Sequence, residues 1–481
     1  MKKWISLLTA LALPLSFCAC GAAEGSSAAT VSAPPALLQA GYAQANITPT
    51  DSVPMNEGGE GKDHMSLGVL DHLYATCVYL VDDAGTELYL MAFDLCNMYP
   101  PLPNYRLQLA KKLGVEENQV MFSASHTHSS VNIKATQIPS ISKYLSLLKN
   151  GLEEAAVSAK LDAKPVTGMY HTAADTQNLN FVRRYVMVDG SYAGDNYGNH
   201  SLGYAGHETE GDHQLQLLKL TREGGKDIIL TNFQGHPHRV TYYDSKDNTL
   251  LSSDIVGAYR EELAKRLDCH ALYYTGSSGN MNSHSRIEEE NVHATYKDHA
   301  KAMVNYAEEA AASFKPLELG QIKLTKLLYV GKTNHTEDHL LPQAKIVAER
   351  YNSGMGNSAS LEGYKDLFLH SRHALSVVSH AALPETTEVP LYAFSVGGFS
   401  ACFAPFELFA ELGMQIKAGS PFDATFVCCY SNYIHSYMPT QLAFDHGGYG
   451  AYKCNFEPGT GEKLVDVYTN LLTGLHTSKG E

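Results

Sequence analysis

The sequence predicts an α/β protein built in layers, with a mixed sheet and with its chemically active side chains at strand ends. Short apolar runs of strand length alternate with longer segments of helical periodicity over most of the chain. The 481 residues are enough to bury one large core or two smaller ones. Histidine, glutamate and tyrosine follow several of the apolar runs, and strand ends are where α/β folds place their sites.

The elements are expected in the following order. Strands are predicted where short apolar runs are bounded by turn residues, as in the pair that the Asp82–Gly85 turn connects. Helices are predicted where apolar residues recur every three or four positions, and Ser253-Asp254 is expected to cap one of them. The expected strands are 73–81, 87–95, 119–122, 213–220, 227–233, 271–275, 391–396, 401–404 and 425–430, and the expected helices are 104–113, 144–161, 255–267, 292–311 and 462–472.

Residues 331–390 interrupt this alternation. They are rich in His, Glu and Ser, and we expect either an inserted subdomain or a long lid. No linker separates two domains clearly, so residues 39–478 are predicted to form one catalytic domain.

The N-terminus has the pattern of an export signal. Lys2-Lys3 is basic, Ile5–Leu15 is apolar but too short to span a membrane stably, and Ser16–Gly21 is rich in small residues. Residues 1–19 resemble a bacterial lipoprotein signal, with cleavage before a lipidated Cys20, although an ordinary secretory signal cut a few residues later is the alternative. Residues 20–38 are expected to be a flexible tether, so the protein is predicted to be exported and anchored at a membrane surface.

Charge and cysteine content narrow the function classes. With 36 basic and 51 acidic residues the net charge is −15, which argues against nucleic acid as a partner and against adsorption to anionic lipid headgroups. The cysteines beyond Cys20 are odd in number and irregularly spaced, so neither a disulfide framework nor a Cys-based zinc knuckle is predicted. Those inside apolar runs are expected in the core: Cys77, Cys96, Cys402 and Cys428.

The segment Ser123–Ser129 carries the first candidate site. It follows an apolar run, and in an extended segment His126 and His128 would point to the same face. Neutral imidazole is the commonest protein ligand for zinc, so the pair is half of a possible metal site.

Other strand ends supply the remaining candidates. His236 follows the strand 227–233, and Glu407 follows the strand 401–404. Tyrosines lie in the loops 432–437 and 447–449 beyond the strand 425–430. Strand ends converge at one edge of a sheet, so these groups are expected to meet. Two acidic, His-containing stretches, His207–His213 and His335–His339, are instead expected to be solvated turns.

Together these segments resemble the neutral/alkaline ceramidase family of zinc amidases, in its bacterial secreted branch and without the family's C-terminal β-sandwich. The resemblance covers most of the chain beyond the signal. It rests on segments that agree in order, spacing and context: Gly41–Thr48, Ser123–Ser129, Asn232–Pro237, Ala404–Gly413, Asn432–Tyr449 and Gly459–Lys463.

The resemblance implies a role for individual residues. The family's zinc ligands fall on His126, His236, Glu407 and Tyr437, with Tyr430 and Tyr433 as competing tyrosines. Its proton-handling histidine falls on His128, and its oxyanion tyrosine falls on Tyr449. The arginine that grips the substrate falls on Arg183, with Arg184 as the register alternative.

One loop departs from the family. Its Gly-Asp-Val-Ser-Pro-Asn sequence, whose serine contacts the substrate, reads Gly279–His284 here, and Asn282 occupies the place of the serine. An asparagine is able to donate a hydrogen bond to an oxyanion but cannot act as a nucleophile. A serine mechanism would need Ser277, Ser278 or Ser283 instead, whereas a mechanism based on metal-activated water survives the change.

The donor set fits the cofactor that the resemblance implies. Two imidazoles, a carboxylate and a tyrosine oxygen form a hard site suited to Zn²⁺. The sequence therefore predicts a zinc-dependent hydrolase that cleaves an N-acyl amide bond of a ceramide-like or other lipid substrate. The alternatives are a zinc esterase or deacylase acting on another small substrate, and an inactive surface-binding lipoprotein.

Overall fold

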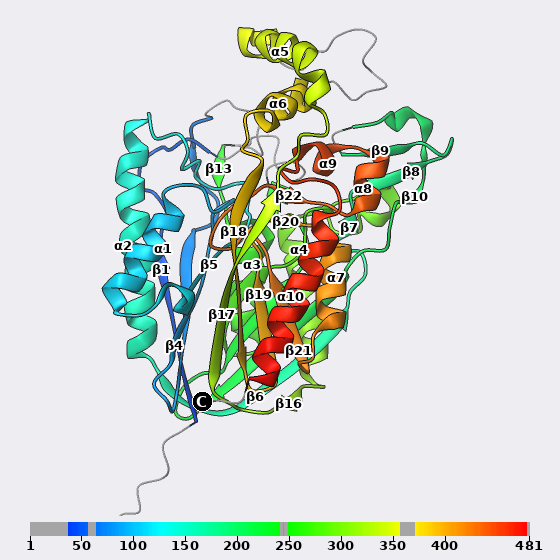
Figure 1. The fold of residues 1–481 in the computed structure, drawn as a ribbon. Coiled ribbons are helices and arrows are strands. Elements are labelled where there is room, and N and C mark those ends of the chain that lie inside the picture. The colour runs from blue at the N-terminus through cyan, green and yellow to red at the C-terminus, as the bar shows by residue number, and fades with distance from the viewer. Residues whose placement is uncertain are drawn as a thin grey trace, which may run out of the picture. The chain divides into compact units, whose positions relative to one another are not determined.

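Two β-sheets, covered on their outer faces by helices, meet around a shared apolar core in a computed structural model of the chain (Figure 1). The structure describes residues 37–55, 64–195, 197–240, 244, 249–355 and 371–478. All of them belong to one unit of the chain, residues 36–481.

The larger sheet has nine strands in the order β14-β12-β11-β6-β1-β3-β4-β5, with β16 paired to β6. Only two residue pairs, Gln39 with Pro165 and Ala40 with Lys164, join β1 to β6, so the sheet divides there into two wings. Its strands are β1 Leu38–Asn46, β3 Tyr74–Asp82, β4 Glu87–Phe93, β5 Val120–Ala124, β6 Lys164–Asp175, β11 Gln214–Arg222, β12 Ile228–Phe233, β14 His270–Thr275 and β16 Lys315–Leu317.

The second sheet has four strands in the order β17-β18-β19-β21. They are β17 Ile322–Lys332, β18 Thr386–Val396, β19 Phe399–Phe403 and β21 Ala424–Cys428. Parallel pairs join β4 to β5, β12 to β14 and β19 to β21, whereas the other neighbours in these sheets run antiparallel. The predicted mixed sheet in a layered α/β fold is therefore confirmed.

Burial on both faces explains why the central strands read as continuous apolar runs. In β4, Leu88 and Leu90 face the core between the sheets, whereas Tyr89 and Met91 face the helices outside. The outer helices are α1 Leu102–Leu113 and α2 Pro139–Leu161 on one wing, α3 Asp254–Arg266 and α4 Tyr296–Ala311 on the other, and α7 Ala410–Gly419 and α10 Thr460–Thr477 on the second sheet.

Small paired segments complete the fold around the strand ends. A three-stranded sheet contains β8 Arg184–Met187, β9 Tyr192–Gly194 and β10 Tyr204–His207. The two-residue pairs are β2 Gly68–Val69 with β13 Leu250–Leu251, β7 Phe181–Val182 with β15 Met281–Asn282, and β20 Glu407–Leu408 with β22 Tyr437–Met438. Two short helices follow, α8 Gln441–His446 and α9 Tyr449–Lys453.

Two expectations about how helices begin were wrong. Ser253 makes no capping bond through its side chain, and Asp254 instead accepts from the Ile255 N–H at 2.7 Å. The helix expected from Val292 begins at Tyr296, because the Thr295 side chain accepts from the Asp298 N–H and caps it there. On α2 the buried stripe contains Tyr144, Leu148 and Leu152, whereas Leu145 and Leu147 are only partly buried.

The sequence reading assigned no strand to β1, β6 or β17. All three expose many of their side chains, and β17 forms an edge of its sheet. Partly exposed strands lack the apolar runs that mark the central strands, which is why patterning did not reveal them.

The interruption expected at 331–390 is an insertion at the tip of a hairpin. Lys332 of β17 pairs with Thr386 of β18, so the insertion spans 333–385. It contains α5 Leu341–Arg350 and α6 Ser371–His380, which lie beyond the end of the sheet in Figure 1, and α6 contacts α9. Residues 356–370 lie outside the described residues.

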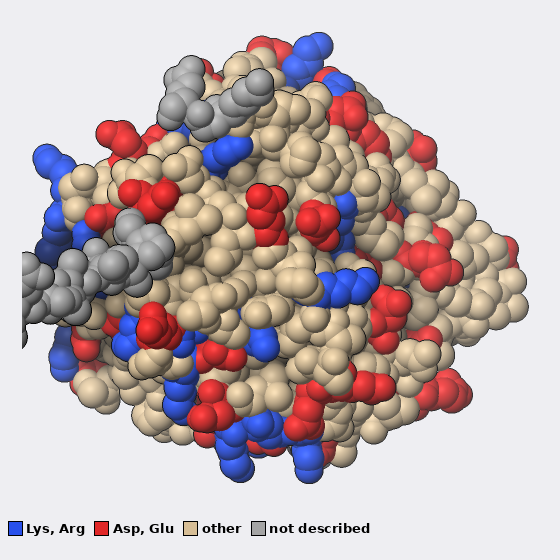
Figure 2. All heavy atoms as spheres, turned by 90° about the horizontal axis from the view of Figure 1, so that it is seen from below, with Lys and Arg blue, Asp and Glu red and all other residues tan. Residues whose placement is uncertain are grey.

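The segments predicted at the N-terminus lie outside the described residues, except for positions 37 and 38 of the tether. The signal peptide, Cys20 and the tether up to residue 36 are not described, while Leu38 is fully buried as the first residue of β1. Within the described ranges, no helix is both long and apolar enough to cross a membrane. On the face shown in Figure 2, basic and acidic side chains are interspersed.

We expect Gly41→Ala to destabilise the fold strongly. A Cβ on Gly41 would lie 1.9 Å from the Ala159 carbonyl oxygen and 2.8 Å from the Ala163 nitrogen, both of which are backbone atoms at the end of α2. Overpacking against backbone costs about 1–3 kcal/mol or more in unfolding free energy, measurable by denaturant titration. Gly474→Ala on α10 is the control, because a Cβ there meets nothing within 4 Å. Equal stability of the two variants would contradict the packing of β1 on α2.

Candidate metal centre

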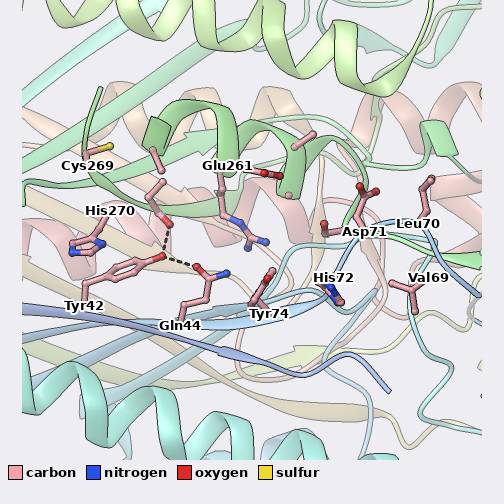
Figure 3. Close-up of a pocket in the computed structure, with 16 residues that line it drawn as sticks. Tyr42, Gln44, Val69, Leu70, Asp71, His72, Tyr74, Glu261, Cys269 and His270 are labelled. Atoms are coloured by element: carbon pink, nitrogen blue, oxygen red, sulfur yellow. Dashed lines mark hydrogen bonds between the residues drawn. The ribbon is translucent and has the colours of Figure 1, made fainter. Parts of the chain in front are cut away.

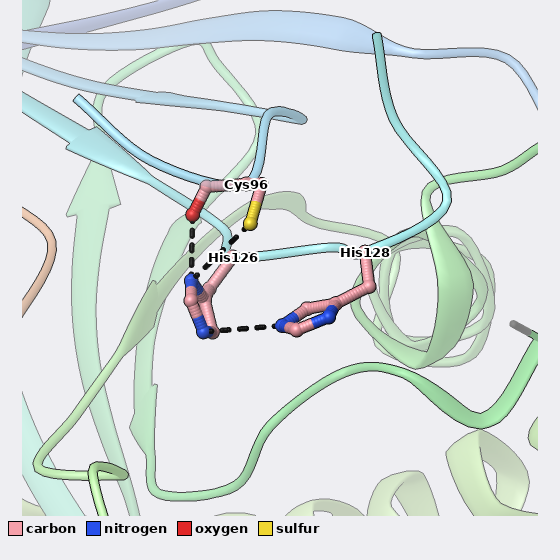
Figure 4. Close-up of side chains that lie close together, drawn as sticks. All are labelled: Cys96, His126 and His128. Atoms are coloured by element: carbon pink, nitrogen blue, oxygen red, sulfur yellow. Dashed lines mark hydrogen bonds between the residues drawn. The ribbon is translucent and has the colours of Figure 1, made fainter. Parts of the chain in front are cut away.

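His126 lies just past β5, in a backbone conformation that the sequence did not suggest. The strand ends at Ala124, and His126 has a φ of 67°, in the left-handed region. His126 and His128 were expected to share a face because the segment would be extended, and the segment is not extended at His126. The two rings do meet, with 3.3 Å between their Nε2 atoms, because the chain turns between them (Figure 4).

The backbone fixes the tautomer of His126. Its Nδ1 lies 2.6 Å from the Cys96 carbonyl oxygen, which can only accept, so Nδ1 carries the proton (Figure 4). Nε2 then presents a lone pair on the opposite side of the ring. The ring of Tyr430 stacks on that of His126 at 3.8 Å between centroids and holds its plane.

His236 is arranged in the same way. It lies beyond the end of β12, and its Nδ1 donates to the Met281 carbonyl oxygen at 3.0 Å. Its Nε2 is buried and has no hydrogen-bond partner. In both histidines a carbonyl therefore orients the ring and leaves Nε2 able to bind a metal.

Glu407 completes a three-ligand cluster. It begins β20, and its Oε2 lies 3.3 Å from His236 Nε2 and 3.7 Å from His126 Nε2. The three ligand atoms lie within 4.8 Å of one another, and Glu407 Oε2 has no hydrogen-bond partner. Lone pairs that face a carboxylate in a buried site repel one another unless a cation lies between them. The residues present thus fit the zinc ion that the sequence predicts.

Tyr437 lies beside this cluster. Glu407 of β20 and Tyr437 of β22 are directly paired, and the Tyr437 hydroxyl accepts from Arg183 Nη2 at 3.0 Å. Of the competing tyrosines, Tyr430 bonds Ser278 through its hydroxyl at 3.1 Å, and Tyr433 lies near Arg106. The geometry favours Tyr437 as the fourth donor, through its hydroxyl oxygen.

The two candidate arginines have different environments. Arg183 Nη2 also donates to the Gly279 carbonyl oxygen at 2.7 Å, so its guanidinium lies at the cluster. Arg184 instead forms a buried ion pair with Glu208 and donates to the Gly447 carbonyl oxygen at 2.8 Å. Burial opposes the charge of Arg183, but nearby Tyr437, Asp195 and Glu407 outweigh it and raise its pKa.

Burial keeps the histidines neutral. It lowers the pKa of His128 to about 4, and it lowers the pKa of His126 and of His236 well below 6.5. Metal ligation requires the neutral imidazole, so the low dielectric favours the form that binds.

Cys96, His126 and His128 form a second group of possible ligand atoms. However, Cys96 Sγ lies 3.8 Å from His126 Nδ1, the nitrogen already committed to the Cys96 carbonyl. The group with Glu407 is therefore the better metal site, although the prediction that Cys96 is a buried core residue is confirmed.

Tyr449 and Asn282 lie close to the cluster. The ring of Tyr449, at the start of α9, packs edge-on against that of Tyr437 at 5.4 Å between centroids. Asn282 is fully buried in β15, with its Oδ1 3.1 Å from His238 Nε2 and its Nδ2 bonded to Asp195. Its predicted contact with an oxyanion stays a prediction.

The alternative serines are engaged elsewhere. Ser278 Oγ lies 3.1 Å from the Gly276 carbonyl oxygen, and Ser283 Oγ donates to the His236 carbonyl oxygen at 2.9 Å. Ser277 lies beside the Cys429 thiol at 3.9 Å. No nucleophilic serine is favoured by these contacts.

Sequence reasoning missed two residues of the site, His238 and Asp195. His238 is buried, and its ring lies 5.5 Å from that of His128 and 5.7 Å from that of His236. The His-x-His pattern of residues 126–128 occurs again at residues 236–238, and this repeat could have indicated His238 from the sequence. Asp195 follows β9 and lines a small hollow of about 20 Å³ with Arg183 and Tyr449. No local pattern marked it.

The stretch His207–His213 is not the solvated turn that was expected. Glu208 and Asp212 are buried in ion pairs with Arg184 and Lys417, whose side chains come from distant parts of the chain. At the second stretch, His335 pairs with Asp338 in a largely exposed turn.

A cavity of about 620 Å³ lies beside α3 and is lined by residues that include Tyr42, His72 and His270 (Figure 3). Arg260, also in its wall, donates to the buried carboxylate of Asp94 at 2.6 Å. The chain next to Asp94 includes Leu95 and Cys96, the residues that hold His126. The cavity therefore lies next to the Arg260–Asp94 pair, and Asp94 is close in sequence to the residues that hold His126.

Comparison with known proteins gives a match in structure. No family model matches the chain, and no curated protein matches it by sequence. A crystal structure of neutral ceramidase from Pseudomonas aeruginosa superposes with a TM-score of 0.66 at 15% identity, covering 92% of this chain and 75% of that chain. A structure of ceramidase complexed with C2 superposes with a TM-score of 0.65 at 15% identity and the same coverage.

The chain has the fold of neutral ceramidase. At this identity the similarity concerns architecture, and the ceramidase-like roles of individual residues rest on the local geometry described above. Within the ceramidase fold, the clustered side chains lie where the ends of β5 and β12 meet β20 and β22.

The cluster is expected to bind one Zn²⁺ per chain. His236→Ala and Glu407→Gln should each lower the zinc content of the purified protein at least tenfold after dialysis, because each removes one ligand. The measurement is elemental analysis by mass spectrometry. His171→Ala on β6 is the control, since this histidine bonds Gln216 in a different part of the sheet and should leave the zinc content unchanged. Full zinc content in either ligand variant would exclude this site.

The metal-free protein is expected to lose stability as the pH falls. The pKa of His128 is about 4 in the folded chain, against 6.5 for an unperturbed imidazole. Between these values the unfolded chain binds protons that the folded site excludes, so the free energy of unfolding decreases with falling pH. His128 alone accounts for about 3 kcal/mol over this range.

Denaturant titration of chelator-treated protein from neutral to acidic pH measures this slope. His128→Gln should flatten it, because glutamine does not titrate. An unchanged slope in that variant would show that His128 is not held neutral.

Proposed function

We propose that this protein is a zinc-dependent hydrolase that cleaves an N-acyl amide bond in a lipid or related amphiphile. The observation that carries the proposal is the convergence of His126, His236 and Glu407 in a buried site, with unpartnered His236 Nε2 and Glu407 Oε2. The neutral ceramidase fold supports the reaction class, and ceramide-like amides are the substrates that the fold suggests.

The binding residues are the three cluster ligands with Tyr437 as the fourth donor. When bound there, Zn²⁺ supplies a Lewis acid that polarises a carbonyl and lowers the pKa of water to about 7. The buried carboxylate offsets part of the charge of the ion, and the neutral imidazoles supply lone pairs.

We assign to Arg183 and Tyr449 the role of stabilising the transition state. The guanidinium of Arg183 remains charged beside Tyr437, and Tyr449 lines the same small hollow. Donors directed at a developing oxyanion in a water-poor site contribute about 10²–10³-fold each to the rate.

His128 is the proton-handling residue of this proposal. It is neutral, and its Nε2 lies 3.3 Å from the ligand nitrogen of His126. A neutral imidazole at that position accepts a proton during attack and returns it to the leaving amine.

Export and membrane anchoring complete the proposal, and they rest on the N-terminal sequence alone. A lipid on Cys20 and the tether that follows would hold the hydrolase next to lipid substrates. Mass analysis of the protein purified from membranes would detect the acylated Cys20.

A panel of N-acyl and O-acyl substrates, assayed with and without chelator, tests the reaction. We expect chelator-sensitive amide hydrolysis, with kcat lowered about 10²–10⁴-fold by His128→Ala at unchanged zinc content. The matched control is His171→Ala. Hydrolysis of esters alone would replace the amidase by an esterase, and full zinc content without any turnover would indicate a binding protein.

A further inference from the structure

The side chain of Asn282 makes two hydrogen-bond contacts within the protein. Asn282 is fully buried, and its backbone forms a parallel bridge with that of His236. Its side chain lies between two titratable groups, with Oδ1 3.1 Å from His238 Nε2 and Nδ2 bonded to Asp195 Oδ2.

The chemistry of the partners fixes the direction of both hydrogen bonds. The amide nitrogen of Asn282 donates to Asp195 Oδ2, so its oxygen faces His238 Nε2, and an amide oxygen only accepts. His238 must then carry its proton on Nε2. Asp195 is held from its other side by Arg286, whose Nε donates to Oδ1 at 3.2 Å and whose Nη2 donates to the Asp195 carbonyl oxygen at 2.9 Å.

His238 connects Asn282 and Asp195 to the candidate site, because its ring lies next to the ring of His128. The rings of His238 and His128 are perpendicular, with centroids 5.5 Å apart. The backbone N–H of His128 also donates to the carbonyl oxygen of Pro237 at 3.3 Å. Fixing His238 thus limits where the ring of His128 can lie, beside His126.

We propose that Asn282 is a positioning residue: it ties His238 to Asp195, and the clamp so formed holds His128 in its proton-handling position. The inference deepens the proposed hydrolase and rests on it. Asp195, Asn282 and His238 act through His128 and do not bind the metal.

A swap of donor and acceptor tests the clamp. Asn282→Asp places two carboxylates opposite each other, and Asp195→Asn removes the acceptor for the amide of Asn282. Each single variant should lower kcat about 10–100-fold with KM and zinc content nearly unchanged. In the double variant Asp195→Asn with Asn282→Asp, the new amide at position 195 donates to the new carboxylate at position 282. The carboxylate at 282 still accepts from His238, and the amide oxygen at 195 still accepts from Arg286. The double variant should recover kcat to within about threefold of the wild type, since a complementary pair is re-formed.

A matched control is Asn334→Asp. Asn334 is also buried, and its amide donates to the Cys454 carbonyl oxygen at 3.1 Å, away from His238. The change also places a carboxylate where a buried amide donated a hydrogen bond, and it should leave kcat close to the wild-type value. Wild-type kcat in both single variants, or a double variant no better than the singles at full zinc content, would overturn the clamp.

A second readout separates the clamp from the proposed function. The ¹⁵N chemical shift of His238 Nε2 in zinc-loaded protein should report a protonated nitrogen in the wild type and in the double variant. An unprotonated Nε2 in the wild type would overturn the clamp whatever the activity. If the wild type binds zinc, shows this proton and hydrolyses nothing, the proposed function fails while the hydrogen-bond assignment stands.

Discussion

The candidate site depends on two backbone carbonyls. The carbonyl oxygens of Cys96 and Met281 each accept a hydrogen bond from the Nδ1 of a histidine, and so fix which nitrogen of His126 and His236 faces Glu407. Without these two bonds the imidazoles would be free to flip, and the buried carboxylate would meet a donor instead of a lone pair. The Cys96 carbonyl comes from the loop after β4 and the Met281 carbonyl from β15, so the two tautomers depend on two separate parts of the fold.

Part of this organisation was predictable from the sequence. His126, His236 and Glu407 follow strands whose two buried faces make them easy to recognise, and parallel strand ends converge by geometry. The reason given for the pairing of His126 with His128 failed, because a left-handed residue replaces the expected extended chain. Side-chain periodicity holds only while the backbone stays in the strand.

Other features were not predictable, because their partners are remote in sequence. Asp195 bonds Asn282, 87 residues away, and buried Asp212 pairs with Lys417, 205 residues away. Local composition marks such acidic residues as solvated, and tertiary pairing overrides that. Likewise β1, β6 and β17 were missed because their exposed faces dilute the apolar pattern.

The insertion between β17 and β18 has a consequence for how the family of folds can diversify. Its ends meet at one rung of a hairpin, and it carries a small apolar cluster of its own around Leu340, Val347 and Val377. Closing a flexible loop costs only about 0.6 kcal/mol more for each doubling of its length. Segments of very different size can therefore be exchanged at this rung with the strand register and the metal ligands left in place. The insertion 333–385, which contacts α9, can therefore change in length without moving the strands that carry the candidate metal ligands.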